Sequence, residues 1–150
     1  MELSERVKLI ADEVEKLGYE PEPLKETDGI VFHTPTGHFA VLIYADNENY
    51  AAVVFPDFWP IHNDGELEAV LMSASKTNAS CRGVKVYVRN DGEQTVALVP
   101  LIGPPQHTSR MLAWSVKMLD EAVNFFGQKM GEIAAFLLAN EGPVDPKQIH

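Results

Sequence analysis

The stretch at residues 30–55, IVFHTPTGHFAVLIYADNENYAAVVF, decides how this chain folds. It is rich in β-branched and aromatic residues, and two turn signals, PTG at 35–37 and DNEN at 46–49, divide it into three runs. Runs of this composition separated by such turns predict three antiparallel strands. Upstream, Pro21 and Pro23 remove two backbone donors, so residues 19–28 can form an edge strand at most.

The first turn predicts how these strands pair. Pro35 and a left-handed Gly37 fit a three-residue loop, which would pair Thr34 with His38 and His33 with Phe39. Alternation along the strands then predicts two faces. One face carries Ile30, Phe32, Ala40, Leu42, Ala51, Val53 and Phe55, and the other carries Val31, Phe39, Val41, Ile43, Ala52 and Val54. Both faces are apolar, so helices can cover one, while the other needs further elements, a second subunit or a ligand.

Amphipathic helices are predicted before and after these strands. Apolar residues at steps of three and four mark residues 3–17 as a helix, with Arg6 on its solvent side. A second helix is predicted at about 64–78, where Asn63 and Glu66 fit a capping box.

A second hairpin is predicted at 84–89 and 93–101, around the turn sequence NDG. With Gly92 left-handed, Arg89 would face Glu93 and Tyr87 would face Thr95. The other face of this hairpin would carry Val84, Val86, Val88, Val96 and Leu98.

The longest predicted element is a helix from about residue 108 to residue 138. Its apolar stripe keeps a 3.5-residue period, which is typical of a helix packed along another helix. The stripe residues, which we predict to serve dimerisation or helix packing, are Leu112, Val116, Leu119, Val123, Phe126 and Met130. A second apolar track of Met111, Met118, Ala122 and Phe125 gives this helix more apolar surface than one neighbour covers.

The order of elements predicts one α+β domain with an antiparallel sheet, in the order α-βββ-α-ββ-α. A chain of 150 residues has the usual length of one domain. We place this domain at residues 1–139 and predict a disordered tail at 140–150, where Gly142, Pro143 and Pro146 interrupt regular structure.

An aromatic, proline-rich loop, FPDFWPIH at 55–62, follows the three central strands. It is either a plug that seals the core or a stiff recognition surface, since large aromatic residues dominate interface energetics. The residues predicted to bind a partner are Phe55, Phe58, Trp59 and Ile61, together with Tyr87.

Candidate catalytic and metal-binding residues are few. His33 and His38 flank one turn, but the predicted register points them to opposite faces and supplies no third ligand, so we expect no metal site. Asp57, His62 and Asp64 lie close in sequence, where an Asp–His pair can act as a general base, although helix capping by Asp64 explains the same residues.

The lone cysteine and the charge balance exclude several functions. Cys81 stands alone, which rules out an internal disulfide, and Arg82 beside it favours a lower thiol pKa, although a small structural residue is the simpler interpretation. The net charge of −10 argues against nucleic acid and suits a partner with basic segments. The charged N-terminus lacks a signal core, and no apolar run is long enough for a bilayer, so we expect a cytoplasmic protein without membrane contact.

With the TPTGHFAVLIYAD hairpin, the NDG hairpin and the long last helix in this order, the chain resembles the type III secretion chaperone-like fold. Within that fold it is most similar to the YbjN-like family of bacterial sensory transduction regulators. The resemblance covers about residues 3–138 and implies a curved sheet packed on helices, no active site and often a homodimer. The secretion chaperones hold an extended client segment, whereas the longer last helix and the aromatic loop favour the regulator branch.

The function predicted from the sequence is therefore protein binding without catalysis, cofactor or metal. We expect a homodimeric chaperone-like or regulatory protein that holds a protein or peptide client, because the apolar surface exceeds what one copy can bury. A small-molecule-binding protein or enzyme with a pocket near residues 55–64 is the alternative. A third possibility is a structural subunit of a larger complex.

Overall fold

The computed structural model describes residues 1–25, 27–89 and 91–141, with side chains of the last helix described to residue 137. The elements in chain order are α1 (Leu3–Lys16), β1 (Glu22–Pro23), β2 (Gly29–His33), β3 (His38–Ile43), β4 (Tyr50–Phe55), α2 (Asp64–Ser80), β5 (Lys85–Arg89), β6 (Gln94–Ile102), α3 (Pro105–Thr108), a 3₁₀ turn at Ser109–Met111 and α4 (Leu112–Glu141). The predicted α+β class and element order are confirmed, with β1 as an additional short strand.

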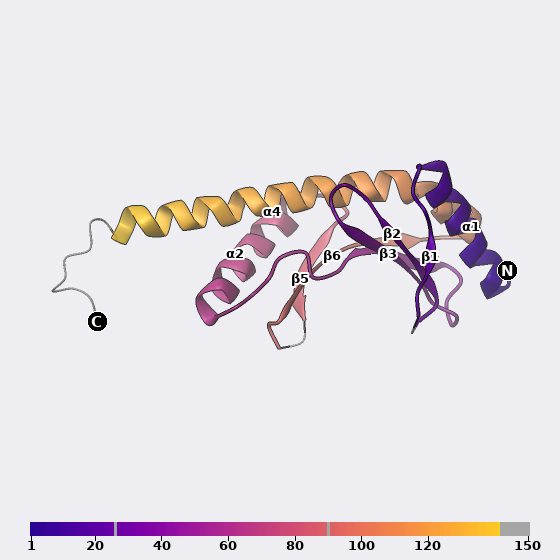
Figure 1. Cartoon of the computed structure of the whole chain (residues 1–150), viewed down its shortest axis with the longest axis horizontal. Coiled ribbons are helices and arrows are strands. Elements are labelled where there is room, and N and C mark those ends of the chain that lie inside the picture. The colour runs from indigo at the N-terminus through magenta and orange to yellow at the C-terminus, as the bar shows by residue number, and fades with distance from the viewer. Residues whose placement is uncertain (26, 90, 142–150) are drawn as a thin grey trace.

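The strands form one six-stranded antiparallel sheet in the order β1-β2-β3-β4-β6-β5. Figure 1 shows α4 running along the length of the molecule over the sheet, with α1 at one end and α2 near the other. Residues from α1, α2 and α4 join one side of the sheet in a single core cluster. The N-terminus and the last described turn of α4 lie at opposite ends of the molecule (Figure 1).

The predicted pairing of β2 with β3 is wrong by one residue. His33 pairs with His38 and Phe32 with Phe39, because the loop holds two residues rather than three. Thr34 and Gly37 exchange two backbone hydrogen bonds of 2.8 and 3.1 Å, and the Thr34 hydroxyl accepts from the Thr36 N–H. Since side chains alternate along a strand, this shift moves every residue of β3 to the opposite face from the one predicted.

The predicted register of β5 and β6 is also wrong by one residue. Arg89 pairs with Gln94 and Tyr87 with Val96, because Asp91 joins Gly92 in the left-handed region with φ of 54° and 90°. The extra left-handed residue lengthens the loop by one position. Val86 therefore shares its face with Ala97.

The corrected registers give a sheet with an inner and an outer apolar face. The inner face packs against the helices through Ile30, Phe32, Phe39, Val41, Ile43, Ala51, Val53, Phe55, Val86, Ala97, Val99 and Leu101. The outer face carries a small separate cluster of Ala52, Val54 and Val96, with Leu42, Tyr50, Tyr87 and Leu98 packed around it. Both faces are apolar, as the sequence predicts, but side chains of the sheet itself already shield the centre of the outer one.

Arg6 ties α1 to the turn between β3 and β4. The sequence places it on the solvent side, but it is only 5 % exposed. Its guanidinium donates to the backbone carbonyls of Tyr44, Asn47 and Tyr50 at 2.8, 3.2 and 3.3 Å. An arginine presents several donors in a fixed plane, which suits a cluster of turn carbonyls.

We expect Arg6→Met to lower the free energy of unfolding by about 2 kcal/mol, because the buried arginine's charge-assisted hydrogen bonds to the turn carbonyls would be lost. Lys8→Met, at an exposed position on the same helix, is the control and should change stability little. Urea unfolding followed by circular dichroism measures both. Equal stability of the two variants would contradict the role given to Arg6.

Replacing either of two glycines with alanine should change the stability of the fold, in opposite directions at the two positions. At Gly37, with φ of 151°, an added Cβ would lie 2.8 Å from the Phe55 ring, so Gly37→Ala should destabilise by about 1–3 kcal/mol. At Gly131 in α4, no other described part of the chain beyond the adjacent turns of the helix comes within 4 Å of an added Cβ, so Gly131→Ala should stabilise by about 1 kcal/mol. Thermal unfolding measures the change in melting temperature of each variant. A change in the same direction for both would contradict the packing described at these two glycines.

A candidate docking groove between α2 and α4

The first half of α4 is fixed to the core. Among the residues predicted for dimerisation or helix packing, Leu112, Val116, Leu119 and Phe126 are buried and Val123 and Met130 are partly buried against the core. Their contact with the core agrees with the interpretation that they pack the helix within one subunit. The dimer interpretation stays a prediction.

The aromatic loop lies beside the same helix. Phe58 and Trp59 contact the Phe126 ring with centroid distances of 5.1 and 5.5 Å, and Phe55 contacts Phe58 at 5.6 Å. Phe55 is buried, and Phe58, Trp59 and Ile61 pack partly buried against the core, whereas Tyr87 lies on the outer face of the sheet. The structure therefore brings four of the five predicted partner-binding residues together, and sets Tyr87 apart.

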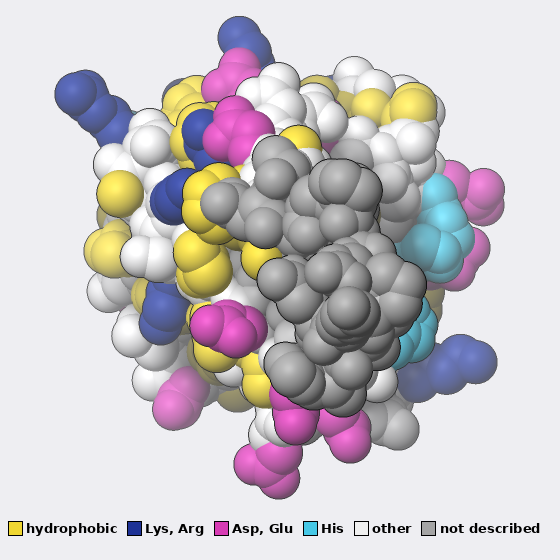
Figure 2. Space-filling view, turned by 90° about the vertical axis from the view of Figure 1, so that its left-hand side faces the viewer, with side chains coloured by type: hydrophobic (Ala, Val, Ile, Leu, Met, Phe, Trp, Pro, Cys, Tyr) yellow, Lys and Arg dark blue, Asp and Glu magenta, His cyan; other side chains and the backbone are white. Residues whose placement is uncertain are grey.

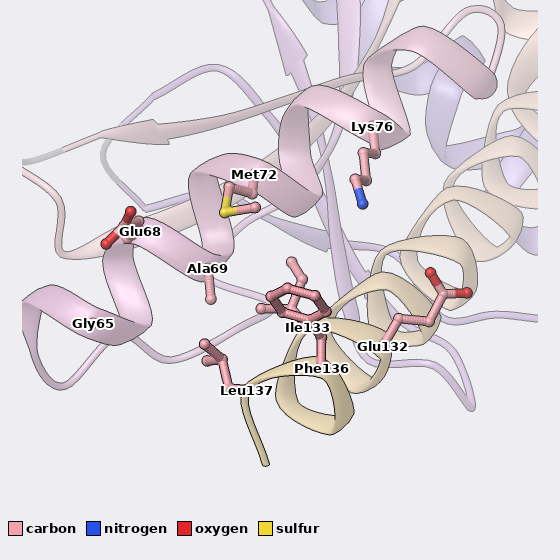
Figure 3. Close-up of a pocket in the computed structure, with 9 residues that line it drawn as sticks. All are labelled: Gly65, Glu68, Ala69, Met72, Lys76, Glu132, Ile133, Phe136 and Leu137. Atoms are coloured by element: carbon pink, nitrogen blue, oxygen red, sulfur yellow. The ribbon is translucent and has the colours of Figure 1, made fainter. Parts of the chain in front are cut away.

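Beyond Met130, α4 continues alongside α2 and leaves a groove of about 660 Å³ between the two helices. The α2 side is lined by Gly65, Glu68, Ala69, Met72 and Lys76, and the α4 side by Glu132, Ile133, Phe136 and Leu137. Figure 3 shows the α4 side chains Ile133 and Phe136 directed toward Ala69 and Met72 of α2.

The groove is apolar and open to solvent. Phe136, Leu137 and Met72 are 65 %, 52 % and 47 % exposed, and Ile133 is buried. In Figure 2, hydrophobic side chains gather at this end of the molecule, with lysine, arginine and acidic side chains around them. Large apolar side chains grouped in a concave site are unusual on a protein surface and mark a docking or ligand site.

Charged side chains at the groove carry both signs. Lys76 on α2 lies near Glu132 on α4 at one side of the groove, and Glu68 lies on α2 (Figure 3). Lys129 forms an ion pair with Glu132 at 3.0 Å, and its ammonium lies 5.0 Å from the centre of the Phe125 ring. The excess negative charge of the chain is therefore not concentrated at this site.

The start of α2 explains His62 in structural terms, and Asn63 rather than Asp64 caps the helix. Asn63 accepts a hydrogen bond from the Glu66 N–H at 2.9 Å, as a capping residue does. Glu66 in turn accepts from the His62 N–H at 2.7 Å and lies 2.9 Å from the His62 ring. The His62 imidazole thus contacts Glu66, and a catalytic role for Asp57, His62 and Asp64 stays a hypothesis.

The hydrogen bond from the His62 N–H, followed by the His62 side chain, holds the pKa of Glu66 below its usual value. A carboxyl with a lowered folded pKa stabilises the fold above its unfolded pKa, and this contribution is lost as the pH falls through the folded value. We expect Glu66→Gln to reduce the loss of stability on acidification below about pH 4. Denaturant unfolding between pH 3 and pH 7 measures this, with Glu68→Gln as the control. Identical profiles for wild type and Glu66→Gln would contradict it.

The histidine pair also differs from the prediction. Because His33 pairs with His38, their rings share one face, with centroids 3.9 Å apart. Two imidazoles are fewer than the three or four protein ligands of most zinc sites. Within the described residues, no group of three or more His, Cys, Asp or Glu side chains is placed to hold a metal ion.

Cys81 is partly buried, and burial, followed by the charge of Glu121, raises the pKa of its thiol. The lower thiol pKa, which the sequence offers as the lesser alternative to a structural residue, is therefore contradicted. A thiol with a raised pKa is a poor nucleophile near neutral pH, which agrees with a structural residue.

Sequence reasoning missed the groove. Neither Met72 nor Phe136 belongs to an apolar stripe that the sequence predicts, and nothing in the sequence places α2 beside the end of α4. The available signal was Phe136 and Leu137 continuing the apolar pattern of the last helix beyond the length that the rest of the domain covers.

These features define an α+β protein with one antiparallel sheet, helices on its inner face and an open apolar groove at one end. The chain belongs to the YbjN family, described as "Putative bacterial sensory transduction regulator", whose model matches residues 6–127. A search of curated proteins gives no match. The predicted family is thus confirmed, and the match ends before the α4 residues that line the groove.

A solved structure shares the fold. It is the crystal structure of YbjN from E. coli, named there as "a putative transcription regulator", with 15 % sequence identity and a TM-score of 0.56. The alignment covers 88 % of this chain and 93 % of that chain. Among the described residues, none of the helices has the length and apolar character needed to cross a membrane.

Proposed function

We propose that this protein is a regulator that acts by binding a polypeptide rather than by catalysis, and that the groove between α2 and α4 is its docking site. The observation that carries the proposal is the joint exposure of Met72, Phe136 and Leu137 in one groove. Membership of the YbjN family, with its description as a regulator, supports a role in signalling.

The chemistry of the groove suits an apolar helical or extended segment of protein. Buried aromatic and aliphatic anchors provide most of the binding free energy of protein interfaces, and Phe136 offers such an anchor. Met72 has an unbranched, polarisable side chain that adapts to different partners. Lys76, Glu68 and Glu132 form a charged rim around the apolar centre, as in many interfaces.

One of the predicted partner-binding residues, Tyr87, lies on a second, smaller surface. Tyr87 on the outer face lies under the Lys85 ammonium, which is 5.2 Å from the ring centre. We keep the outer face as a secondary contact surface, in line with the proposed role of a protein that holds a client.

A synthetic amphipathic helical peptide of zero net charge should bind the groove with an affinity in about the micromolar range. We expect Phe136→Glu to weaken this binding at least about tenfold, because it places a charge in the apolar centre. Leu71→Glu is the matched control, since Leu71 is exposed on α2 and does not line the groove. Fluorescence anisotropy measures all three proteins, and a lack of peptide binding to wild type would contradict the proposal.

A small apolar ligand is the alternative occupant. The groove volume of about 660 Å³ falls in the range of small-molecule sites. A thermal-shift screen with metabolites and metal ions separates the two functions, because a ligand that binds the native state raises its melting temperature. A clear shift with a small compound, lost in Phe136→Glu, would favour the alternative.

A further inference from the structure

Two histidines beside the turn of the β2–β3 hairpin belong neither to the groove nor to the core cluster. His33 ends β2, His38 begins β3, and both side chains are exposed. We propose that these two imidazoles form a surface site for a transition-metal ion, with copper(II) as the ion that binds most tightly. The site shares no residue with the groove between α2 and α4, so its test is independent of the proposed function.

The turn between the two strands brings the rings close together. Thr34 and Gly37 exchange both backbone hydrogen bonds, so the next pair along the antiparallel ladder, His33 with His38, is a non-hydrogen-bonded pair. In such a pair the Cα atoms lie only about 4.5 Å apart and the side chains approach most closely. The ring centroids are accordingly 3.9 Å apart, with an angle of 55° between the ring planes. The two-residue loop thus removes the opposite-face placement on which the sequence-based argument against a metal site rests.

This geometry allows one ion to be held by both rings. Two metal–nitrogen bonds of about 2.0–2.1 Å at a right angle place the nitrogens roughly 3 Å apart. Rings whose centroids are 3.9 Å apart can bring nitrogens to that separation by rotation about the side-chain torsions. Exposed side chains rotate readily, and the paired strands keep the two backbones in place. The site therefore needs little rearrangement to bind, which favours affinity.

The number of protein ligands decides which ion fits. Among the described residues, no third His, Cys, Asp or Glu is placed to complete the site. Two imidazoles leave a tetrahedral zinc site half filled, whereas a tetragonal copper(II) ion accepts two adjacent nitrogens and takes water at its other positions. Copper(II) also binds a given nitrogen site more tightly than the other divalent ions of its series. Magnesium and calcium prefer oxygen ligands and should not bind here.

The charge around the pair favours a cation. Glu22 on β1 pairs with Val31, which lies two residues before His33 and on the same face of β2. Lys85 is on the same face of the sheet but three strands away from β3, a separation of about 14 Å at the usual strand spacing. That separation exceeds the screening length of about 8 Å at physiological salt. The net charge of −10 adds to the attraction.

Isothermal titration calorimetry of the full chain with copper(II) chloride tests the proposal. We expect the tightest site to hold one ion per chain, with a dissociation constant in about the micromolar range, and weaker binding of nickel(II) and zinc(II). His33→Thr and His38→Thr place a residue suited to strands at each position. Each should weaken copper binding at least about tenfold, because a single imidazole loses the gain from joined ligands. His107→Thr, at an exposed histidine of α3, is the control and should bind as wild type does.

The same titrations give the results that would overturn the proposal. These are no binding by wild type at about 1 mM copper, unchanged binding in His33→Thr or His38→Thr, or an equal loss in His107→Thr. Electron paramagnetic resonance of the wild-type complex supplies a test that needs no variant. It should show coupling of the copper(II) electron to two imidazole nitrogens, and coupling to only one would also overturn the proposal.

A bound ion should in addition hold β2 and β3 together. A ligand that binds the native state stabilises it by mass action, so copper(II) at a hundred times its dissociation constant should raise the melting temperature of wild type by roughly 5–10 °C. His33→Thr should show no such rise. A melting temperature of wild type that copper leaves unchanged, or an equal rise in the variant, would overturn the bridging of the two strands by the ion.

Discussion

The packing of α4 along the inner face of the sheet is the contact on which the rest of the structure depends. Leu119 and Phe126 are fully buried, and Phe126 is also where the aromatic loop meets the helix through Phe58 and Trp59. The 30 residues of this helix extend over about 45 Å. Because the core holds only the first part of that length, Ile133, Phe136 and Leu137 extend past it and lie beside α2.

This division of α4 links the fold to function. If the apolar stripe of α4 ended where the core ends, the turns beyond it would be polar. Instead, Phe136 and Leu137 continue the apolar pattern. Exposing large apolar side chains costs solubility, so their presence in a groove beside α2 is better explained by a partner than by folding alone. The outer face of the sheet differs from the groove, because its apolar centre is covered by the sheet's own side chains. Tyr50, Tyr87 and Leu98 shield Val54 and Val96 there.

Much of the fold could be predicted because it follows from local patterns. The strands, the edge position of residues 22–23, the Asn63 cap and the stripe of α4 all depend on residues close in sequence. The strand registers could not be predicted, because they depend on whether Thr34 closes a two-residue loop and whether Asp91 adopts a left-handed conformation. Each is a small local choice, and each moves every side chain of a strand to the other face.

The groove was harder to predict than the core because no single segment contains it. Met72 looks like one more apolar residue of a surface helix until α4 is placed beside it. The burial of Arg6 was hard to predict for the same reason. Its three acceptors lie in a turn about forty positions away in the chain. Pairings between distant segments follow from tertiary packing, which periodicity does not specify.

Hydrogen exchange along α4 tests the central claim most directly, because amide protection reports local stability. The account predicts strong protection of residues 112–126 at every protein concentration. It predicts that residues 131–137 exchange faster in the free protein and become protected when the amphipathic helical peptide is bound. Equal protection of both segments in the free protein, unchanged by the peptide, would contradict the account, because the end of α4 would then be complete without a partner.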